Sequence, residues 1–228
     1  MSQTSYSPIG DSLVGTRNRV LRNTYMLLAL SMLPTIAGAY LGVQMGFSFF
    51  AGSPMISFIV FMAIAFGFFF MIEKFKNSSV GVLLLLCFTF FMGLMLSRIL
   101  QVMLGFSNGT QLIALAAGGT ATIFFAMATL ATVIKRDLSG MGKFLFVGMI
   151  VALIAAVANI FLQVPALSIA ISSVVLCIFS AYILYDVNRI VTGGETNYIS
   201  ATLAIYLDVY NVFVSLLQLL GIFGGDRD

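Results

Sequence analysis

The last long apolar segment, residues 199–223, reads ISATLAIYLDVYNVFVSLLQLLGIF and contains a single charged residue, Asp208. As a helix it is long enough to cross the hydrocarbon of a bilayer, which takes about 20 residues. A charged side chain inside such a span costs about 2.5–3.5 kcal/mol on insertion scales, and it usually faces other helices or a water-filled cavity. The segment therefore predicts a membrane-spanning helix whose acid faces protein or water.

The same apolar character runs through most of the 228 residues, of which 61% are hydrophobic and only 8% are charged. Soluble domains carry about 25% charged residues. We therefore expect an all-α, polytopic membrane protein with seven transmembrane helices. The membrane domain covers residues 25–223, between a cytoplasmic tail at 1–24 and a short C-terminal tail at 224–228. The expected spans are 25–43, 54–72, 80–98, 110–134, 144–164, 166–190 and 199–223.

Basic residues give the expected orientation, because cytoplasmic loops carry an excess of Lys and Arg. One side of the predicted bundle has only Arg98 and Arg227, and Arg98 is expected to extend toward the membrane surface. The N-terminus is therefore predicted to be cytoplasmic, and the C-terminus lies outside if the seventh helix crosses fully. The basic residues of the cytoplasmic side are Arg17, Arg19, Arg22, Lys74, Lys76, Lys135, Arg136, Lys143 and Arg189.

The chain has no histidine. This composition excludes Ser-His-Asp and Cys-His catalysis and metal sites that need imidazole. The chain has no basic tract with interleaved aromatic residues, so we do not expect nucleic acid as a partner. We expect no enzyme activity and no cofactor.

A second acid, Asp186, lies in the sixth predicted span, five residues from its cytoplasmic end near Val191. Asp208 lies eight residues into the seventh span, which begins near Ser200. At 1.5 Å per residue these depths are about 7–8 Å and about 12 Å. Since the two spans are antiparallel and joined by a short loop, 192–199, their carboxylates can lie at similar depth on facing helices.

A polar face on the seventh span runs from Asp208 through Asn211, Ser215 and Gln218, which are spaced by three, four and three residues. Such a helix belongs in the centre of a bundle or beside a water-filled path. Two structural explanations remain open. Hydrogen bonds between helices could fix packing through this face, and Arg189 could pair with Asp186 along one helix.

If the two acids meet, their protonation is coupled, because two close carboxylates in a low dielectric do not easily both ionise. Low pH would favour a neutral pair that shares a proton. High pH would favour repulsion, opening, or entry of a hard cation such as Ca²⁺, which prefers oxygen ligands. Asp186 and Asp208 are thus candidates for a pH sensor, an ion path and a transient Ca²⁺ site.

Several segments, taken together, resemble the Bax inhibitor-1 family of membrane proteins, and more closely its bacterial YccA-like branch. The resemblance covers about residues 17–223. Its segments are VLRNTY at 20–25, KRDLS at 135–139, VANIFLQVPAL at 157–167, GGETNYI at 193–199 and YLDVYNVFVSLLQLLG at 206–221.

The resemblance implies a bundle in which six helices surround the seventh. It also implies a pH-sensing acidic pair in the last two helices, as in family members that leak calcium, and Asp186 and Asp208 match those positions. Such members carry an arginine near the end of the second helix, where this chain has EKFK at 73–76. The YccA-like branch is associated with restraint of the membrane protease FtsH at the bacterial inner membrane, with an N-terminal tail, here about residues 1–20, as a plausible contact.

Four functions follow for comparison: a pH-sensitive calcium or cation leak, a modulator of FtsH, a structural membrane scaffold and an intramembrane aspartyl protease. The last is disfavoured although Tyr185-Asp186 matches the YD element of that class. Asp208 follows Ile-Tyr-Leu where that class has Gly-x-Gly, and the Pro-Ala-Leu run at 165–167 precedes both acids instead of following them.

Overall fold

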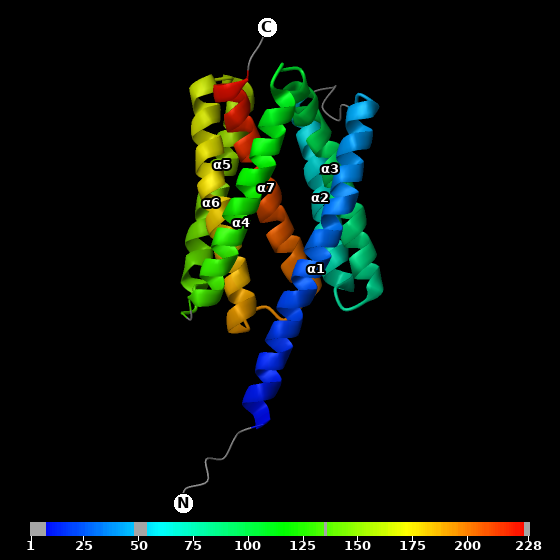
Figure 1. The fold of residues 1–228 in the computed structure, drawn as a ribbon. Coiled ribbons are helices and arrows are strands. Elements are labelled where there is room, and N and C mark those ends of the chain that lie inside the picture. Colours follow the sequence, from blue (N-terminus) through cyan, green and yellow to red (C-terminus); the bar gives the residue numbers. More distant parts are fainter. Residues whose placement is uncertain (1–7, 48–53, 135, 226–228) are drawn as a thin grey trace, which may run out of the picture.

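The computed structural model describes residues 8–47, 54–134 and 136–225, and these residues form seven α-helices and no strand (Figure 1). All seven helices contain a stretch long and apolar enough to cross a membrane. The expected all-α, seven-helix membrane protein is therefore confirmed. The helices are α1 (Pro8–Gln44), α2 (Pro54–Phe75), α3 (Ser79–Leu104), α4 (Gly109–Val133), α5 (Ser139–Leu162), α6 (Pro165–Thr192) and α7 (Tyr198–Gly224).

The connection between α5 and α6 has only two residues, Gln163 and Val164. Gln163 ends α5 in the left-handed conformation, with φ of 52°. Pro165 then begins α6, where its missing N–H and fixed φ are tolerated. The two helices pack directly against each other as an antiparallel pair.

The first helix begins at Pro8, well before the apolar segment that starts near residue 25. Its early part projects beyond the other helices in Figure 1. Hydropathy marks the part of a helix that matches the hydrocarbon, whereas backbone hydrogen bonds continue the helix into polar sequence. Residues 1–7 of the expected tail, residues 226–228 and the orientation charge Lys135 lie outside the described residues.

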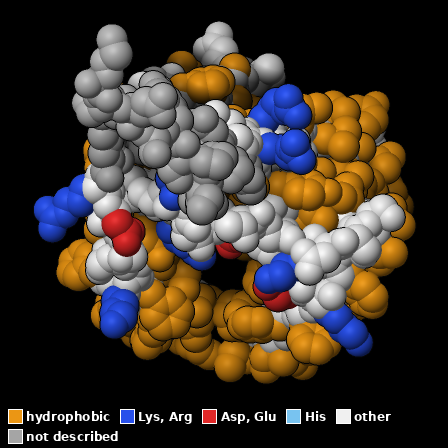
Figure 2. All heavy atoms as spheres, turned by 90° about the horizontal axis from the view of Figure 1, so that it is seen from below, with side chains coloured by type: hydrophobic (Ala, Val, Ile, Leu, Met, Phe, Trp, Pro, Cys, Tyr) orange, Lys and Arg blue, Asp and Glu red, His pale blue; other side chains and the backbone are white. Residues whose placement is uncertain are grey.

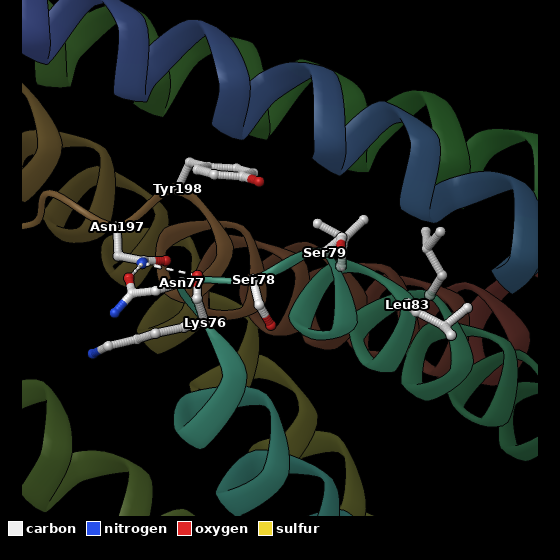
Figure 3. A pocket seen from close by; sticks show the side chains of 9 residues that line it. Lys76, Asn77, Ser78, Ser79, Leu83, Asn197 and Tyr198 are labelled. Carbon is white, nitrogen blue, oxygen red and sulfur yellow. Dashed lines mark hydrogen bonds between the residues drawn. The ribbon is translucent and has the colours of Figure 1, made fainter.

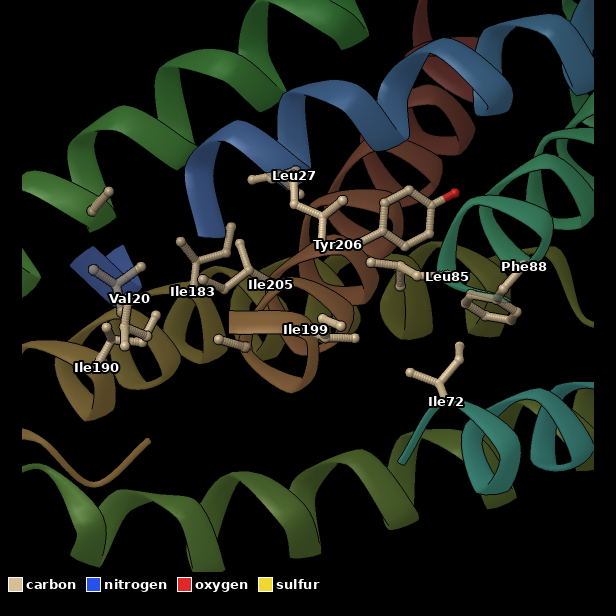
Figure 4. Close-up of a cluster of buried hydrophobic side chains, with 14 of the residues drawn as sticks. Val20, Leu27, Ile72, Leu85, Phe88, Ile183, Ile190, Ile199, Ile205 and Tyr206 are labelled. Carbon is tan, nitrogen blue, oxygen red and sulfur yellow. The ribbon is translucent and has the colours of Figure 1, made fainter. Parts of the chain in front are cut away.

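The main core is formed by side chains of α1, α2, α3, α4, α6 and α7 (Figure 4). Leu85 and Phe88 of α3, Ile183 of α6, and Ile205 and Tyr206 of α7 are almost completely buried. Helix α7 contacts α1, α2, α3, α4 and α6, while α5 packs against α6. A central position for α7 within a ring of six helices stays a prediction.

Large apolar side chains cover the outside of the bundle, including Phe66, Phe70, Phe125 and Phe144. In a soluble protein such a surface would mark an interface, but here it matches lipid. One end of the bundle differs, because Lys and Arg side chains gather there around a hollow (Figure 2). The start of α1 and the α2–α3, α4–α5 and α6–α7 connections meet at this end. The cytoplasmic assignment of this end stays a prediction.

The beginning of α7 is tied to the end of α2 at this same end (Figure 3). Asn197 caps α7, because its side-chain oxygen accepts from the N–H groups of Ile199 and Ser200 at 2.9 and 3.1 Å. Its amide also donates to the carbonyl of Lys76 at 3.0 Å. The side chain of Lys76 donates to Glu73, and this hydrogen bond raises the pKa of the Lys76 ammonium above its usual value.

Asn188, on α6, holds the α4–α5 connection against the bundle. It is completely buried. Its amide nitrogen donates to the carbonyls of Ile134 and Arg136 at 3.1 and 3.2 Å, and its oxygen accepts from the N–H of Leu138 at 3.1 Å. One side chain thus satisfies three backbone groups between α4 and α5.

We expect Asn188→Ala to lower the melting temperature by about 5–10 °C, because buried backbone groups left without partners cost about 1–3 kcal/mol. The measurement is thermal unfolding in detergent, followed by far-ultraviolet circular dichroism. The matched control is Asn211→Ala, whose amide donates to Leu207 within its own helix at 2.8 Å. Equal melting temperatures for the two variants would show that Asn188 does not hold the connection.

Candidate functional site

The site begins with two acids on the antiparallel helices α6 and α7. Asp186 lies two turns before the end of α6, and Asp208 lies inside α7. Gly193 makes the reversal possible, since it ends α6 with φ of 85°, a conformation that favours glycine. The two carboxyl groups lie close enough to influence each other electrostatically. Their residues are 9% and 4% exposed, so both acids lie away from bulk water.

Asp208 is the more isolated of the two acids. Its Oδ2 atom is buried and has no hydrogen-bond partner among the described residues. Buried polar atoms nearly always have a partner, and an exception calls for an explanation such as a bound proton, ion or water. A carboxyl group beside another carboxyl group is suited to hold a proton or to bind a cation at this position.

Asp186 has a basic partner on its own helix. Nη1 of Arg189 lies 3.5 Å from Oδ1 of Asp186, and Nη2 of the same guanidinium lies 3.5 Å from Oε2 of Glu195. Arg189 therefore joins the acid pair to the α6–α7 connection. The arginine that the family resemblance implies near the end of the second helix is missing from this chain, and Lys76 in that region pairs with Glu73. In this chain the guanidinium beside the acids comes from α6.

The remaining polar residues of α7 do not form one network with Asp208. Asn211 bonds to its own helix, as described above, and Ser215 is buried. The oxygen of Gln218 accepts from the hydroxyl of Ser172 on α6 at 2.8 Å. The face that they share with Asp208 thus meets α6 twice, once at the acid pair and once near the opposite end.

A tight metal centre is not assembled at the acids. Among the described residues, no group of three or more His, Cys, Asp or Glu side chains could hold a metal ion. Ca²⁺ normally takes six to eight oxygen ligands. Two carboxylates alone suit a passing cation or a shared proton better than a resident ion.

Sequence reasoning missed two features near the site. Tyr182 lies close enough to interact electrostatically with both acids, and its position one turn before Asp186 was the available signal. The hydroxyl of Tyr206 meets that of Thr35 at 2.9 Å, and Thr35 donates to the carbonyl of Thr89 at 3.1 Å. This cluster joins α7 to α1 and α3, and no spacing rule connects residues so distant in the sequence.

A bundle of seven apolar helices with acids buried between two of them defines a polytopic α-helical membrane protein. Residues 17–225 match the family described as "Inhibitor of apoptosis-promoting Bax1". The chain therefore belongs to the Bax inhibitor-1 family.

Three bacterial relatives show how far the similarity extends. The chain is 40% identical to the "Modulator of FtsH protease YccA" of Escherichia coli K12, over 92% of each chain. It is 40% identical to an uncharacterized protein of Neisseria meningitidis serogroup B, over 90% of this chain and 91% of the relative. It is 39% identical to an uncharacterized protein of Pseudomonas aeruginosa, over 91% of this chain and 90% of the relative.

Proposed function

We propose that this protein is a multi-pass inner-membrane protein that modulates the membrane protease FtsH. The observation that carries the proposal is the relationship to the Escherichia coli modulator, which extends over nearly the whole of both chains. A relative from a second Escherichia coli strain, equally similar, is named as an inner membrane protein. Seven helices able to span a bilayer are consistent with that location.

The early part of α1 is the proposed contact with the protease. It projects beyond the other helices at the end of the bundle where basic residues gather (Figures 1 and 2). Arg17 and Arg19 are exposed there. The guanidinium of Arg17 lies beside Gly193, and Val20 is buried in the core. A partner would therefore contact the chain before Arg17 without disturbing the bundle.

Co-purification tests this proposal with the full chain and a variant that lacks residues 2–16. The deletion ends before Arg17, so the contacts of Arg17 and Val20 remain. We expect FtsH to co-purify with the full chain and at least about fivefold less with the variant, which corresponds to about 1 kcal/mol. Deletion of residues 226–228 is the control at the opposite end. No association with either the full chain or the control would contradict the proposal.

The acid pair supports a second proposed function, a pH-sensitive leak of calcium or a similar cation through the membrane domain. It is supported by two neighbouring carboxyl groups in a membrane-spanning bundle, one of which has a buried oxygen without a partner. Arg189, Glu195 and Tyr182 are the other charged or titratable groups beside the pair. Loss of a shared proton would leave two close negative charges, which repel each other and attract a cation.

Calcium flux from liposomes that contain the purified protein tests the second function. At pH 8 we expect Asp208→Asn to reduce the flux at least about tenfold, because the cation loses half of its carboxylate ligands and the pair loses its repulsion. Asp137→Asn is a matched control, since this exposed acid lies in the α4–α5 connection and accepts only from the N–H and hydroxyl of Ser139, at 2.8 and 3.1 Å, in the part of the chain that the structure describes. Equal flux in the wild type and in Asp208→Asn would contradict a role for the pair.

A further inference from the structure

Beyond the acids, a cavity of about 1110 Å³ extends toward the opposite end of the bundle. One side of the cavity is lined by residues of α7 and the residue that follows it, from Tyr210 to Gly225. Its walls are α3 with Phe61 of α2 on one side, and α5 with α6 on the other. In Figure 1 these two groups of helices flank α7. The volume slightly exceeds the range for sites that hold small organic ligands, about 300–1,000 Å³.

The walls of this cavity are mostly apolar, and their neutral polar groups largely satisfy one another. Asn159 donates to the hydroxyl of Ser168 at 2.7 Å, and the hydroxyl of Ser172 donates to Gln218. Tyr210 donates to the carbonyl of Met92 at 3.2 Å. The apolar wall residues include Phe61, Met95, Leu96, Ile99, Val102, Met103, Phe106, Ile160, Ile171, Val214 and Ile222. Such walls suit hydrocarbon better than water.

Arg98 is the only charged residue among the described residues that line the cavity. It lies six residues before the end of α3 at Leu104, which is about 9 Å below the helix end. A guanidinium at this depth can reach toward the level of the lipid headgroups with its aliphatic stem along apolar surface. It is also well suited to bind phosphate, because its donors match two phosphate oxygens at once.

The cavity opens at the surface of the bundle instead of being enclosed. Two of its lining residues, Val102 and Ile222, are 55% and 51% exposed. They place apolar side chains at the rim, where the outer surface of the bundle meets lipid. A lipid chain can therefore enter from the bilayer without crossing a polar barrier.

We propose that this cavity binds an anionic phospholipid, with one acyl chain between α3 and α5–α6 and the phosphate beside Arg98. Apolar walls alone would not select a lipid, because hydrocarbon is equally favourable in the surrounding bilayer. Selection comes from the charge of Arg98, and a basic residue close to anionic lipid gives a preference of about fivefold. The lipid site is distinct from the acid pair, because neither Asp186 nor Asp208 lines the cavity.

The chain has no tryptophan, so a single introduced tryptophan reports on one place only. We choose Phe61→Trp in the cavity wall and Phe66→Trp on the outer face of the same helix, where Phe66 is 61% exposed. Each variant is reconstituted with phosphatidylcholine that contains a small fraction of a lipid with brominated chains, which quench tryptophan. The measured quantity is the quenching by brominated phosphatidylglycerol divided by the quenching by brominated phosphatidylcholine. The ratio removes differences in depth between the two positions.

We expect this ratio to be about five for Phe61→Trp and close to one for Phe66→Trp. Unbrominated phosphatidylglycerol should reverse the excess quenching. Adding Arg98→Gln to Phe61→Trp should bring the ratio close to one, whereas Arg98→Lys should keep most of it. Lys143→Gln, which removes a charge at the other end of the bundle, should leave it unchanged.

Three results would overturn the proposal. The first is equal ratios at the two positions, which would mean that the cavity does not prefer an anionic lipid. The second is a high ratio that survives Arg98→Gln, which would mean that Arg98 does not hold the phosphate. The third is no quenching of Phe61→Trp by either lipid, which would mean that no acyl chain occupies the cavity.

Discussion

A Gly93→Leu variant should fail to accumulate as a folded protein. Helices α1 and α3 cross so closely that their backbones touch: a side chain at Gly93 would collide with the carbonyl of Thr35, and one at Gly38 with the carbonyl of Phe90. Small residues at such crossings are what allows helices to approach in a membrane. Extra atoms in a packed interior usually cost about 1–3 kcal/mol, and here backbone on the facing helix offers no rotamer that could yield.

The expected result is measured as the yield of monodisperse protein after extraction in mild detergent. Gly118→Leu on α4 is the matched control, since a side chain there would meet nothing within 4 Å and the position is exposed. The control should give a normal yield and elution profile. A normal yield and melting temperature for Gly93→Leu would mean that α1 and α3 do not cross as closely as described.

The second large effect is expected from the acids. With Asp186→Asn and Asp208→Asn combined, calcium flux should be low and should no longer depend on pH. The double variant has neither carboxyl group. Asp186→Asn alone and Asp208→Asn alone each leave one carboxyl group, so either substitution already removes the electrostatic coupling between the two carboxylates. In the wild type, loss of one shared proton can change the flux by up to about tenfold per pH unit.

Arg189 gives a further check on the sign of this effect. Its guanidinium lies beside Asp186 and favours the ionised form of the pair. Arg189→Gln should therefore move the rise in flux to higher pH without abolishing it. A shift to lower pH, or none, would mean that Arg189 does not act on the protonation of the pair.

Much of the architecture could be predicted from the sequence, because membrane-spanning helices are selected by a simple property, the length of an apolar stretch. The same reasoning indicated that Asp186 and Asp208 could meet. Both lie a few turns from a short connection between antiparallel helices, and helix geometry then fixes their depths. Their roles as a pH sensor and a cation site remain predictions.

Other features depend on packing between distant segments, which a single sequence does not reveal. Asn188 satisfies three backbone groups around fifty residues earlier in the chain. Arg98 was expected to reach the membrane surface, but its place in the wall of a cavity depends on how α2, α3, α5 and α6 are arranged around α7. The early start of α1 was missed because hydropathy detects the hydrocarbon and not the end of the helix.

The acid pair is the central claim about the candidate site, and its most direct measurement is the ratio of calcium flux at pH 8 to flux at pH 6 in liposomes of matched protein content. We predict a ratio well above one for the wild type, because the higher pH removes the shared proton. We predict a ratio near one for Asp186→Asn with Asp208→Asn. Equal ratios for the wild type and the double variant would contradict the claim that Asp186 and Asp208 make the membrane domain responsive to pH.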